Sequence, residues 1–290
     1  MADNNLKIML TGITDVGCKR EMNEDGFALC PDLSAADWSQ SGTGGFVDLS
    51  SSGAMIVVAD GMGGAAAGEL ASGIAIETIS QRFSNITSPL TSVSSLRAAI
   101  ATANEAIIRH VDTAPETAGM ATTIVVAWIT STQTVVAWCG DSRCYRYRPD
   151  KGLERVSNDH SYVQQLVNAG EITEDEALTH PESNLVTRCL GDTGVSAQPE
   201  ITLVDMAVGD VLLVCSDGLC GYCPDRDIES ILGRYHADLP VCQEALLQAA
   251  LDAGGNDNIT IALASLADST AVQQPEKSSH SKSWLHRLFG

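Results

Sequence analysis

The sequence lacks any apolar run long enough to cross a membrane as a helix, which takes about 18 or more consecutive apolar residues. Its first seven residues are polar and lack the basic and then apolar order of a secretory signal. We therefore expect a soluble, cytoplasmic protein. The length of 290 residues and the hydrophobic content of 44% favour one large domain over residues 1–267, followed by a tail at 268–290.

Basic residues are also scarce, because 17 Lys and Arg stand against 37 Asp and Glu, for a formal net charge of −20. A chain with this charge repels a polyphosphate backbone, so we expect no nucleic-acid partner. An acidic protein that acts on phosphate must bring positive charge to its site. Bound metal ions are the direct way to do so.

The nine cysteines show no disulfide pattern, since their number is odd and most lie in apolar runs, as Cys139 and Cys215 do. This favours reduced, buried thiols. Cys220 and Cys223 have C-x-x-C spacing, but no second pair completes a zinc site. A redox role for this pair is the weaker alternative.

Short apolar runs rich in β-branched residues predict buried strands at residues 54–59, 122–129, 134–138, 211–215 and 259–263. Residues 130–133 separate two of these runs and suggest a hairpin. Amphipathic patterns predict helices at about 66–83, 93–110, 162–169 and 241–253. Paired strands followed by paired helices favour an α+β layered fold over an alternating parallel one.

Two segments look unlike core. Residues 31–53 are rich in Ser, Gly and Asp and predict an exposed loop or elongated hairpin, to which we assign no chemistry. Residues 268–283 are too polar to order themselves, and the chain then ends in an apolar and basic segment with Trp284, Leu285, Leu288 and Phe289. We hypothesise that this end docks on a partner or a membrane surface, against the alternative of a frayed terminus without function.

Four aspartates stand at the ends of predicted strands, each before a small or turn-forming residue: Asp60, Asp141, Asp217 and Asp257. One Asp-Gly pair alone is more often a tight turn than a site. Four such carboxylates at one rim of a sheet would repel each other strongly, and hard divalent cations would relieve that repulsion. All-oxygen ligands favour Mg²⁺ or Mn²⁺ over zinc.

Six short motifs surround these aspartates. They are Arg20-Glu21-Met22-Asn23-Glu24-Asp25, Asp60-Gly61-Met62-Gly63-Gly64, Gly140-Asp141-Ser142-Arg143, Asp159-His160-Ser161, Ser216-Asp217-Gly218-Leu219 and Asp257-Asn258. Their order and spacing resemble the metal-dependent serine/threonine protein phosphatases of the type 2C family, over nearly all of residues 10–264. The resemblance implies a central β-sandwich of two antiparallel sheets, flanked by helices on both faces, with a metal site at one end.

The resemblance also implies the metal ligands. Asp60 would bridge two ions of Mn²⁺ or Mg²⁺. Asp217 and Asp257 would complete the first ion, and the Gly61 carbonyl with Glu24, through water, would serve the second. A water activated by these ions would attack the phosphorus of phosphoserine or phosphothreonine directly.

Further roles follow from the same resemblance. Asp25 would orient the metal ligands and Arg20 would bind phosphate, which suits the planar fork of a guanidinium. Asp141 would hold a weaker third metal together with Asp217, against the alternative of a turn residue. Met62 stands where animal relatives have a protonating histidine, so the chain resembles bacterial members more closely.

A segment at about residues 160–190 resembles the family's flap, a small element beside the site that could steer protein substrates. His160 and His180, within it, are expected to be structural or substrate-facing. Alanine at Ala121 stands where the family has glycine before Thr122 and Thr123, and we expect activity to be retained.

The expected partners are phosphorylated proteins and a cognate bacterial serine/threonine kinase, with the phosphatase itself a monomer. Two alternatives stay open. One is a non-catalytic scaffold of the same fold, against which the intact Asp60, Asp217 and Asp257 argue. The other is a two-metal hydrolase of nucleotides or nucleic acid, which the acidic charge makes improbable for nucleic acid.

Overall fold

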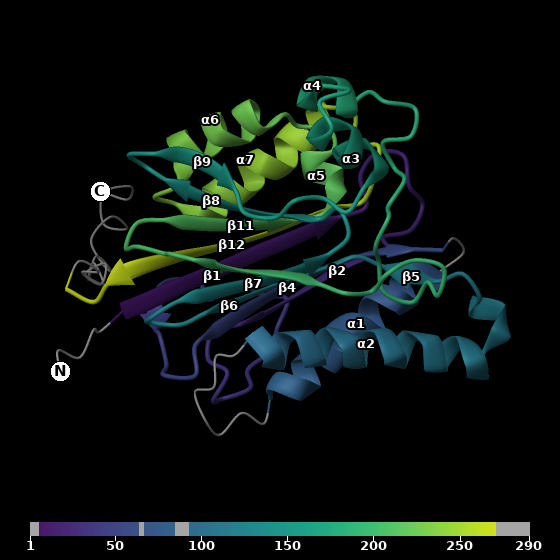
Figure 1. Cartoon of the computed structure of the whole chain (residues 1–290). Coiled ribbons are helices and arrows are strands. Elements are labelled where there is room, and N and C mark those ends of the chain that lie inside the picture. The colour runs from purple at the N-terminus through teal and green to yellow at the C-terminus, as the bar shows by residue number, and fades with distance from the viewer. Residues whose placement is uncertain (1–5, 64–66, 85–92, 271–290) are drawn as a thin grey trace, which may run out of the picture.

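The computed structural model describes residues 6–63, 67–84 and 93–270, and it stacks them in four layers (Figure 1). Two antiparallel sheets form the middle, with strand orders β3-β1-β12-β11-β8-β9 and β10-β7-β6-β4-β2, and β5 pairs with β4. The strands are β1 Leu6–Asp15, β2 Asp25–Cys30, β3 Val47–Asp48, β4 Ala54–Met62, β5 Ala121–Thr122, β6 Ile124–Ile129, β7 Thr134–Cys139, β8 Arg143–Arg148, β9 Gly152–Arg155, β10 Glu200–Val204, β11 Val211–Cys215 and β12 Ile259–Asp268.

Helices cover the outer face of each sheet (Figure 1). Their bounds are α1 Ala67–Phe83, α2 Val93–Thr113, the 3₁₀ turn η1 Pro115–Thr117, α3 Tyr162–Asn168, α4 Glu174–Ala177, α5 Asp217–Cys220, α6 Asp225–Tyr235 and α7 Leu239–Asp252. The expected α+β sandwich is therefore confirmed.

Strand β4 explains why its sequence is apolar without alternation. Successive side chains of a strand point to opposite faces. Ile56 and Val58 enter the core between the two sheets, whereas Met55 and Val57 enter the core under α1 and α2. Both faces of this strand are buried, so both need apolar residues.

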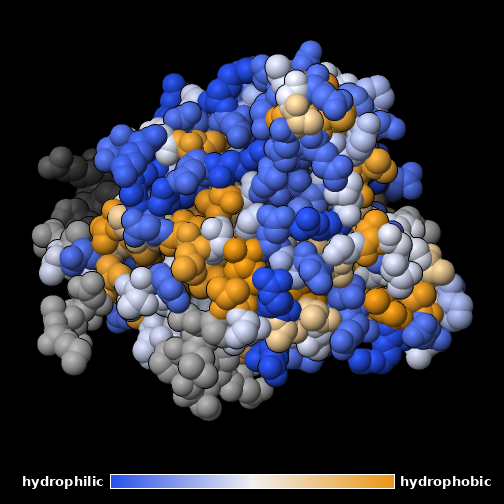
Figure 2. Space-filling view, viewed as in Figure 1, coloured by the Kyte–Doolittle hydropathy of each residue, from blue (hydrophilic) through white to orange (hydrophobic). Residues whose placement is uncertain are grey.

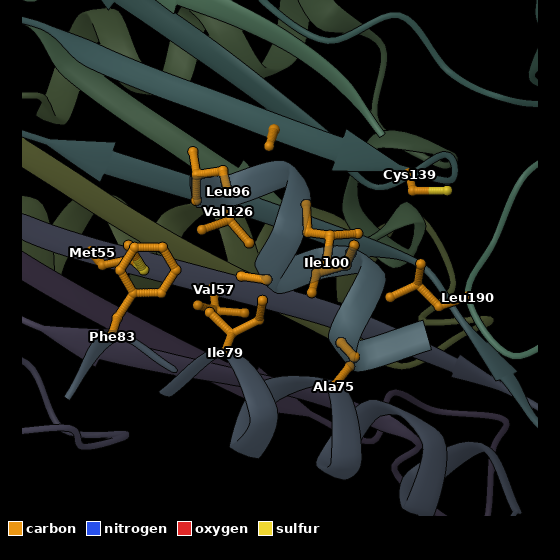
Figure 3. Packing of buried hydrophobic residues seen from close by; sticks show 14 of the residues in the cluster. Met55, Val57, Ala75, Ile79, Phe83, Leu96, Ile100, Val126, Cys139 and Leu190 are labelled. Carbon is orange, nitrogen blue, oxygen red and sulfur yellow. The ribbon is translucent and has the colours of Figure 1, made fainter. Parts of the chain in front are cut away.

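The core under α1 and α2 is drawn in Figure 3, where Ile79 and Phe83 of α1 point toward Met55 and Val57 of the sheet. The rings of Phe83 and Trp128 meet edge to face at 5.1 Å between centroids. A third core joins α5, α6 and α7 to the other sheet. Each sheet is thus held rigidly on both sides.

The predicted hairpin is confirmed, because β6 and β7 pair in antiparallel register from Ile124 opposite Cys139 to Ile129 opposite Thr134. Its turn is closed by Thr130, whose backbone N–H and side-chain hydroxyl both donate to the carbonyl of Gln133. The predicted strands at 54–59, 134–138 and 211–215 are also present, the first two slightly longer.

Other boundaries differ from the prediction. The expected strand at 122–129 is divided, because Thr123 turns its hydroxyl toward the backbone of Asp60 and the side chain of Ser142. Strand β12 runs to Asp268, one residue past the predicted domain end, because Asp268 pairs with Leu6. The segment 31–53 is not wholly exposed, since Leu33 is fully buried and β3 pairs with β1.

The predicted thiol state is confirmed, as all nine cysteines are free and eight are buried. Within the described residues, no helix is both long enough and apolar enough to span a bilayer. The segment at 271–290, with its expected docking role, and Gly64 of the second motif lie outside the described residues.

Candidate active site

A cleft of about 230 Å³ gathers most of the predicted site residues. It is lined by Arg20, Glu24, Asp60, Gly61, Met62, Gly63, Asp141, Asn184, Val186, Asp217, Asp257 and Asn258. Of the residues predicted to bind the metals or phosphate or to orient the metal ligands, only Asp25 is missing from this lining. The four aspartates come from four separate segments, so the fold brings them together as predicted.

Antiparallel pairing places Asp25 beside Asp60. The two residues stand directly opposite each other in the register of β2 and β4. Thr123 then holds the backbone of Asp60 in place: its hydroxyl accepts from Asp60 N at 3.1 Å, and its N–H donates to the Asp60 carbonyl at 2.9 Å. The break between β5 and β6, at Thr123, therefore allows this residue to hold the backbone of Asp60.

Asp217 and Asp257 meet because glycine allows their segments to touch. Asp217 begins α5, directly after β11 and Ser216, and Asp257 precedes β12. A Cβ on Gly218 would lie 1.9 Å from the carbonyl oxygen of Asn258, which no side chain permits. This approach requires glycine at position 218.

Glu24 is held by the start of α1 and by Asn258. Gly68 N–H donates to Glu24 Oε1 at 3.2 Å, and the Ser72 hydroxyl donates to the Glu24 carbonyl at 2.6 Å. Asn258 Oδ1 accepts from Glu24 N at 2.8 Å, while its amide nitrogen donates to Val16 and Met22 carbonyls. The roles of Gly68 and Ser72 are not predictable from the sequence, since small residues are common in helices.

Arg20 reaches the cleft from the loop before β2. Its Nη2 donates to Asp257 Oδ2 at 2.7 Å, and its side chain is 48% exposed. A charged guanidinium therefore stands at the rim of an otherwise acidic cleft.

Asp141 lies deeper, with 8% of its surface exposed, at the bend after β7. Arg143 anchors this bend by binding both carboxylate oxygens of Asp159, with Nε at 2.9 Å from each and Nη2 at 2.7 Å from Oδ2. Asp141 and Asp217 also line a second cavity of about 260 Å³, bounded by α3, α4 and the segment around α5. The predicted flap thus borders the site.

The carboxyl groups in this region resist ionisation. Burial, the largest cause, raises the pKa of Asp25 to about 7 and that of Asp217 to about 6. Burial and the neighbouring carboxylates also raise the pKa values of Asp60 and Asp141 well above their usual range. The Asp60 and Asp217 carboxyls are themselves within hydrogen-bond reach of each other.

Two buried oxygens in the cluster are unsatisfied: Asp25 Oδ2 and Asp217 Oδ1 accept no hydrogen bond. Buried polar atoms without partners are costly, and hard divalent cations prefer carboxylate oxygens. The donor set therefore fits Mg²⁺ or Mn²⁺. In the part of the chain that the structure describes, no three His, Cys, Asp or Glu side chains already surround one point as ligands, and Asp257 instead binds Arg20.

The remaining candidates are not brought into the cleft. His160 is buried, with Nδ1 accepting from Gly140 N at 3.1 Å, so it is structural, and His180 lies against Tyr162. Cys220 and Cys223 are both buried and free. Burial raises the pKa of Cys223 to about 11, which makes a reactive thiolate unfavourable.

Comparison with known proteins gives consistent matches. A family model described as "Protein phosphatase 2C" matches residues 44–253. The serine/threonine phosphatase stp of Listeria monocytogenes is 35% identical over 212 residues, which is 72% of this chain and 83% of that protein. The serine/threonine protein phosphatase PstP of Mycobacterium tuberculosis is 35% identical over 217 residues, 74% of this chain but 40% of that longer protein.

Solved structures agree. The catalytic domain of PstP in complex with 2 manganese ions has a TM-score of 0.74 at 30% identity and covers 91% of this chain and 100% of that one. The phosphatase Stp1 from Staphylococcus aureus also has a TM-score of 0.74 at 30% identity, covering 88% of this chain and 94% of that one.

The raised pKa values predict how the metal-free protein responds to pH. Folded Asp25, with a pKa of about 7, holds a proton that the unfolded chain releases near its usual pKa of about 3.9. The contribution of Asp25 to stability is therefore fully present below about pH 4 and is lost as the pH rises through about 7. Asp217, with a pKa of about 6, acts in the same direction.

Thermal unfolding in excess chelator, followed from about pH 5 to about pH 8, measures this loss. Asp25→Asn removes one titrating group at nearly constant volume and should flatten the fall in Tm. If Tm fell equally with pH in the wild type and in this variant, the raised pKa of buried Asp25 would be contradicted.

Proposed function

This chain belongs to the protein phosphatase 2C family, and from that premise we propose that it hydrolyses phosphoserine and phosphothreonine in proteins with the help of divalent metal ions. The main supporting observation is the acidic cleft, with the unsatisfied Asp217 Oδ1 in its lining, the unsatisfied Asp25 Oδ2 beside Asp60, and Arg20 at its rim. The printed names of the relatives, serine/threonine phosphatases, support this substrate class.

The proposed metal ligands are Asp60, the Gly61 carbonyl, Asp217 and Asp257, with Glu24 acting through water. Two ions of Mn²⁺ or Mg²⁺ fit this all-oxygen set, and the two manganese ions of the PstP structure support the number. When bound, such ions activate water for direct attack on phosphorus and neutralise phosphoryl charge.

The protein's own groups would orient the reactants. Asp25 stands opposite Asp60 in the sheet and would fix its orientation. Arg20, held at the rim by Asp257, would donate hydrogen bonds to phosphate oxygens through its planar fork. Asp141, which lines both cavities with Asp217, would hold a weaker third ion.

The wider setting follows from this activity. We propose that the chain acts in signal transduction in a bacterial cytoplasm, as a monomer that reverses the work of a cognate serine/threonine kinase. Its catalytic domain would comprise residues 1–267 and the final residue of β12, Asp268, with the flap at about 160–190. The rest of the predicted tail at 268–290 would dock on a partner or a membrane surface and so raise the local concentration of the phosphatase near a substrate or kinase.

The first test is hydrolysis of a phosphothreonine peptide with Mn²⁺, with Mg²⁺ or with chelator. Turnover should require a cation, because the carboxylates alone provide no nucleophile. Asp60→Asn and Asp217→Asn should lower kcat by at least about 100-fold, since each deletes charge from a ligand at nearly constant volume.

Asp112→Asn, an exposed change on α2, is the matched control and should leave turnover unchanged. Full turnover in excess chelator would contradict the metal-dependent mechanism. Hydrolysis of nucleotides in preference to the phosphopeptide would favour the rival nucleotide hydrolase, and metal binding without any turnover would favour the scaffold.

A second pair of variants separates two roles. Arg20→Ala should raise KM by about tenfold or more, as expected for losing a charged hydrogen bond to phosphate. Asp141→Ala should leave the two tighter metals bound and change only the metal concentration that activity requires. If calorimetry found both variants missing the same two tight metals, this division of roles would be wrong.

The tail has its own test. Truncation after Thr270 keeps every described strand, including β12. It should leave phosphopeptide turnover unchanged but slow the dephosphorylation of a full-length phosphoprotein, because docking acts only on large substrates. Equal losses with both substrates would show that the tail supports the folded domain itself.

A further inference from the structure

His160 is buried behind the cleft, with 5% of its surface exposed, and it joins the flap to the bend that carries Asp141. Its backbone N–H donates to the Gly140 carbonyl at 2.9 Å, and Gly140 N–H donates back to ring Nδ1 at 3.1 Å. On its other side, the His160 carbonyl accepts from Thr187 N at 2.7 Å. His160 therefore binds both the N–H and the carbonyl of Gly140, the residue directly before Asp141.

These contacts determine the state of the ring. Nδ1 accepts a hydrogen bond, so the neutral ring carries its proton on Nε2, which lies 3.2 Å from Glu200 Oε1 and 3.3 Å from Arg188 Nη1. Arg188 is only a donor and binds the same carboxylate at 3.0 Å. Burial lowers the pKa of His160 and favours this neutral form. The indole of Trp138 stacks on the ring at 6.2 Å between centroids.

Gly140 needs such support because its backbone is unusual. Its φ of +123° belongs to a region that side chains rarely adopt, and a Cβ there would lie 2.5 Å from Thr123 Cβ. The chain turns at this point from β7 into the cleft. A glycine is free to turn in several ways, so the direction of Asp141 depends on what binds the glycine.

We propose that His160 is a positioning residue for Asp141: its Nδ1 fixes the Gly140 peptide and so the place where the Asp141 carboxylate enters the cleft. The inference rests on the proposed function, in which Asp141 binds the weakest of three metals. Glu200 and Trp138 hold the ring, and the flap residue Thr187 holds its backbone.

Two substitutions separate the ring nitrogens. His160→Asn keeps an acceptor near the position of Nδ1, whereas His160→Gln places its amide near Nε2 and removes the acceptor for Gly140. In a calorimetric titration with Mn²⁺, the Gln variant should weaken the weakest binding step by about fivefold to thirtyfold, as expected for one buried hydrogen bond. The tighter steps should be unchanged. The Asn variant should stay within about twofold of the wild type at every step.

A double-mutant cycle with Asp141→Ala tests whether His160 acts through this carboxylate. The effect of His160→Gln on metal binding should vanish in the Asp141→Ala background. His236→Gln, at the end of α6 and against Tyr147, is the matched control and should change no step. If His160→Gln does not fold, His160→Asn still tests the proposal, because this variant must bind the weakest Mn²⁺ with nearly wild-type affinity.

Three results would overturn the proposal: unchanged Mn²⁺ binding in the Gln variant, equal weakening of all steps, or an effect that persists without Asp141. Phosphopeptide turnover of the wild type is measured alongside. A wild type that binds Mn²⁺ in three steps without turnover would sink the proposed function alone, because the calorimetric comparison needs no catalysis.

Discussion

Repulsion among buried carboxylates is the constraint on which the rest of this structure depends. Asp25 and Asp60 stand directly opposite each other in one antiparallel pair, an arrangement that is unfavourable for like charges. Burial then raises the pKa of both, because neither is well solvated. Three apolar cores, one between the sheets and one under each helical layer, must supply the stability that offsets this cost.

Around the site, close backbone contacts add to the rigidity that side-chain packing gives the sheets. Gly61 lies so close to Gly68 that a Cβ would be 2.1 Å from the Gly68 carbonyl oxygen, and Gly218 lies closer still to Asn258. Backbones at such distances cannot slide, whereas side chains between them could repack. Strand register adds a second lock, since a slip of one residue would turn Asp60 to the opposite face of its sheet. The carboxylates cannot move apart to relieve their repulsion, so they must either hold protons, as their raised pKa values indicate, or bind a cation.

The sequence predicts the fold best where a single local pattern, such as a continuous apolar run, determines the element. The run at 54–59 is apolar throughout because both faces of β4 are covered, and the hairpin follows from two such runs close together. The strands β8 and β10 escaped prediction because they mix charged with apolar residues, and Arg146 and Arg148 of β8 find partners only in the folded chain. The ion pair of Arg143 with Asp159 spans sixteen residues of sequence and two elements. No local pattern reveals it, because the partner is chosen by tertiary contact.

The same logic explains why the candidate ligands were found more easily than their supports. Asp60, Asp217 and Asp257 each stand in a short string whose chemistry is visible in the side chain itself. Thr123 and Asn258 act through backbone groups of other residues, so their roles depend on which backbone lies beside them. The Asn258 side chain forms hydrogen bonds with three backbone groups. Any asparagine could do so, and only the folded structure shows that this one does. The sequence therefore predicts which residues are candidate ligands. The positions of these ligands depend on the fold and on the residues that bind their backbones.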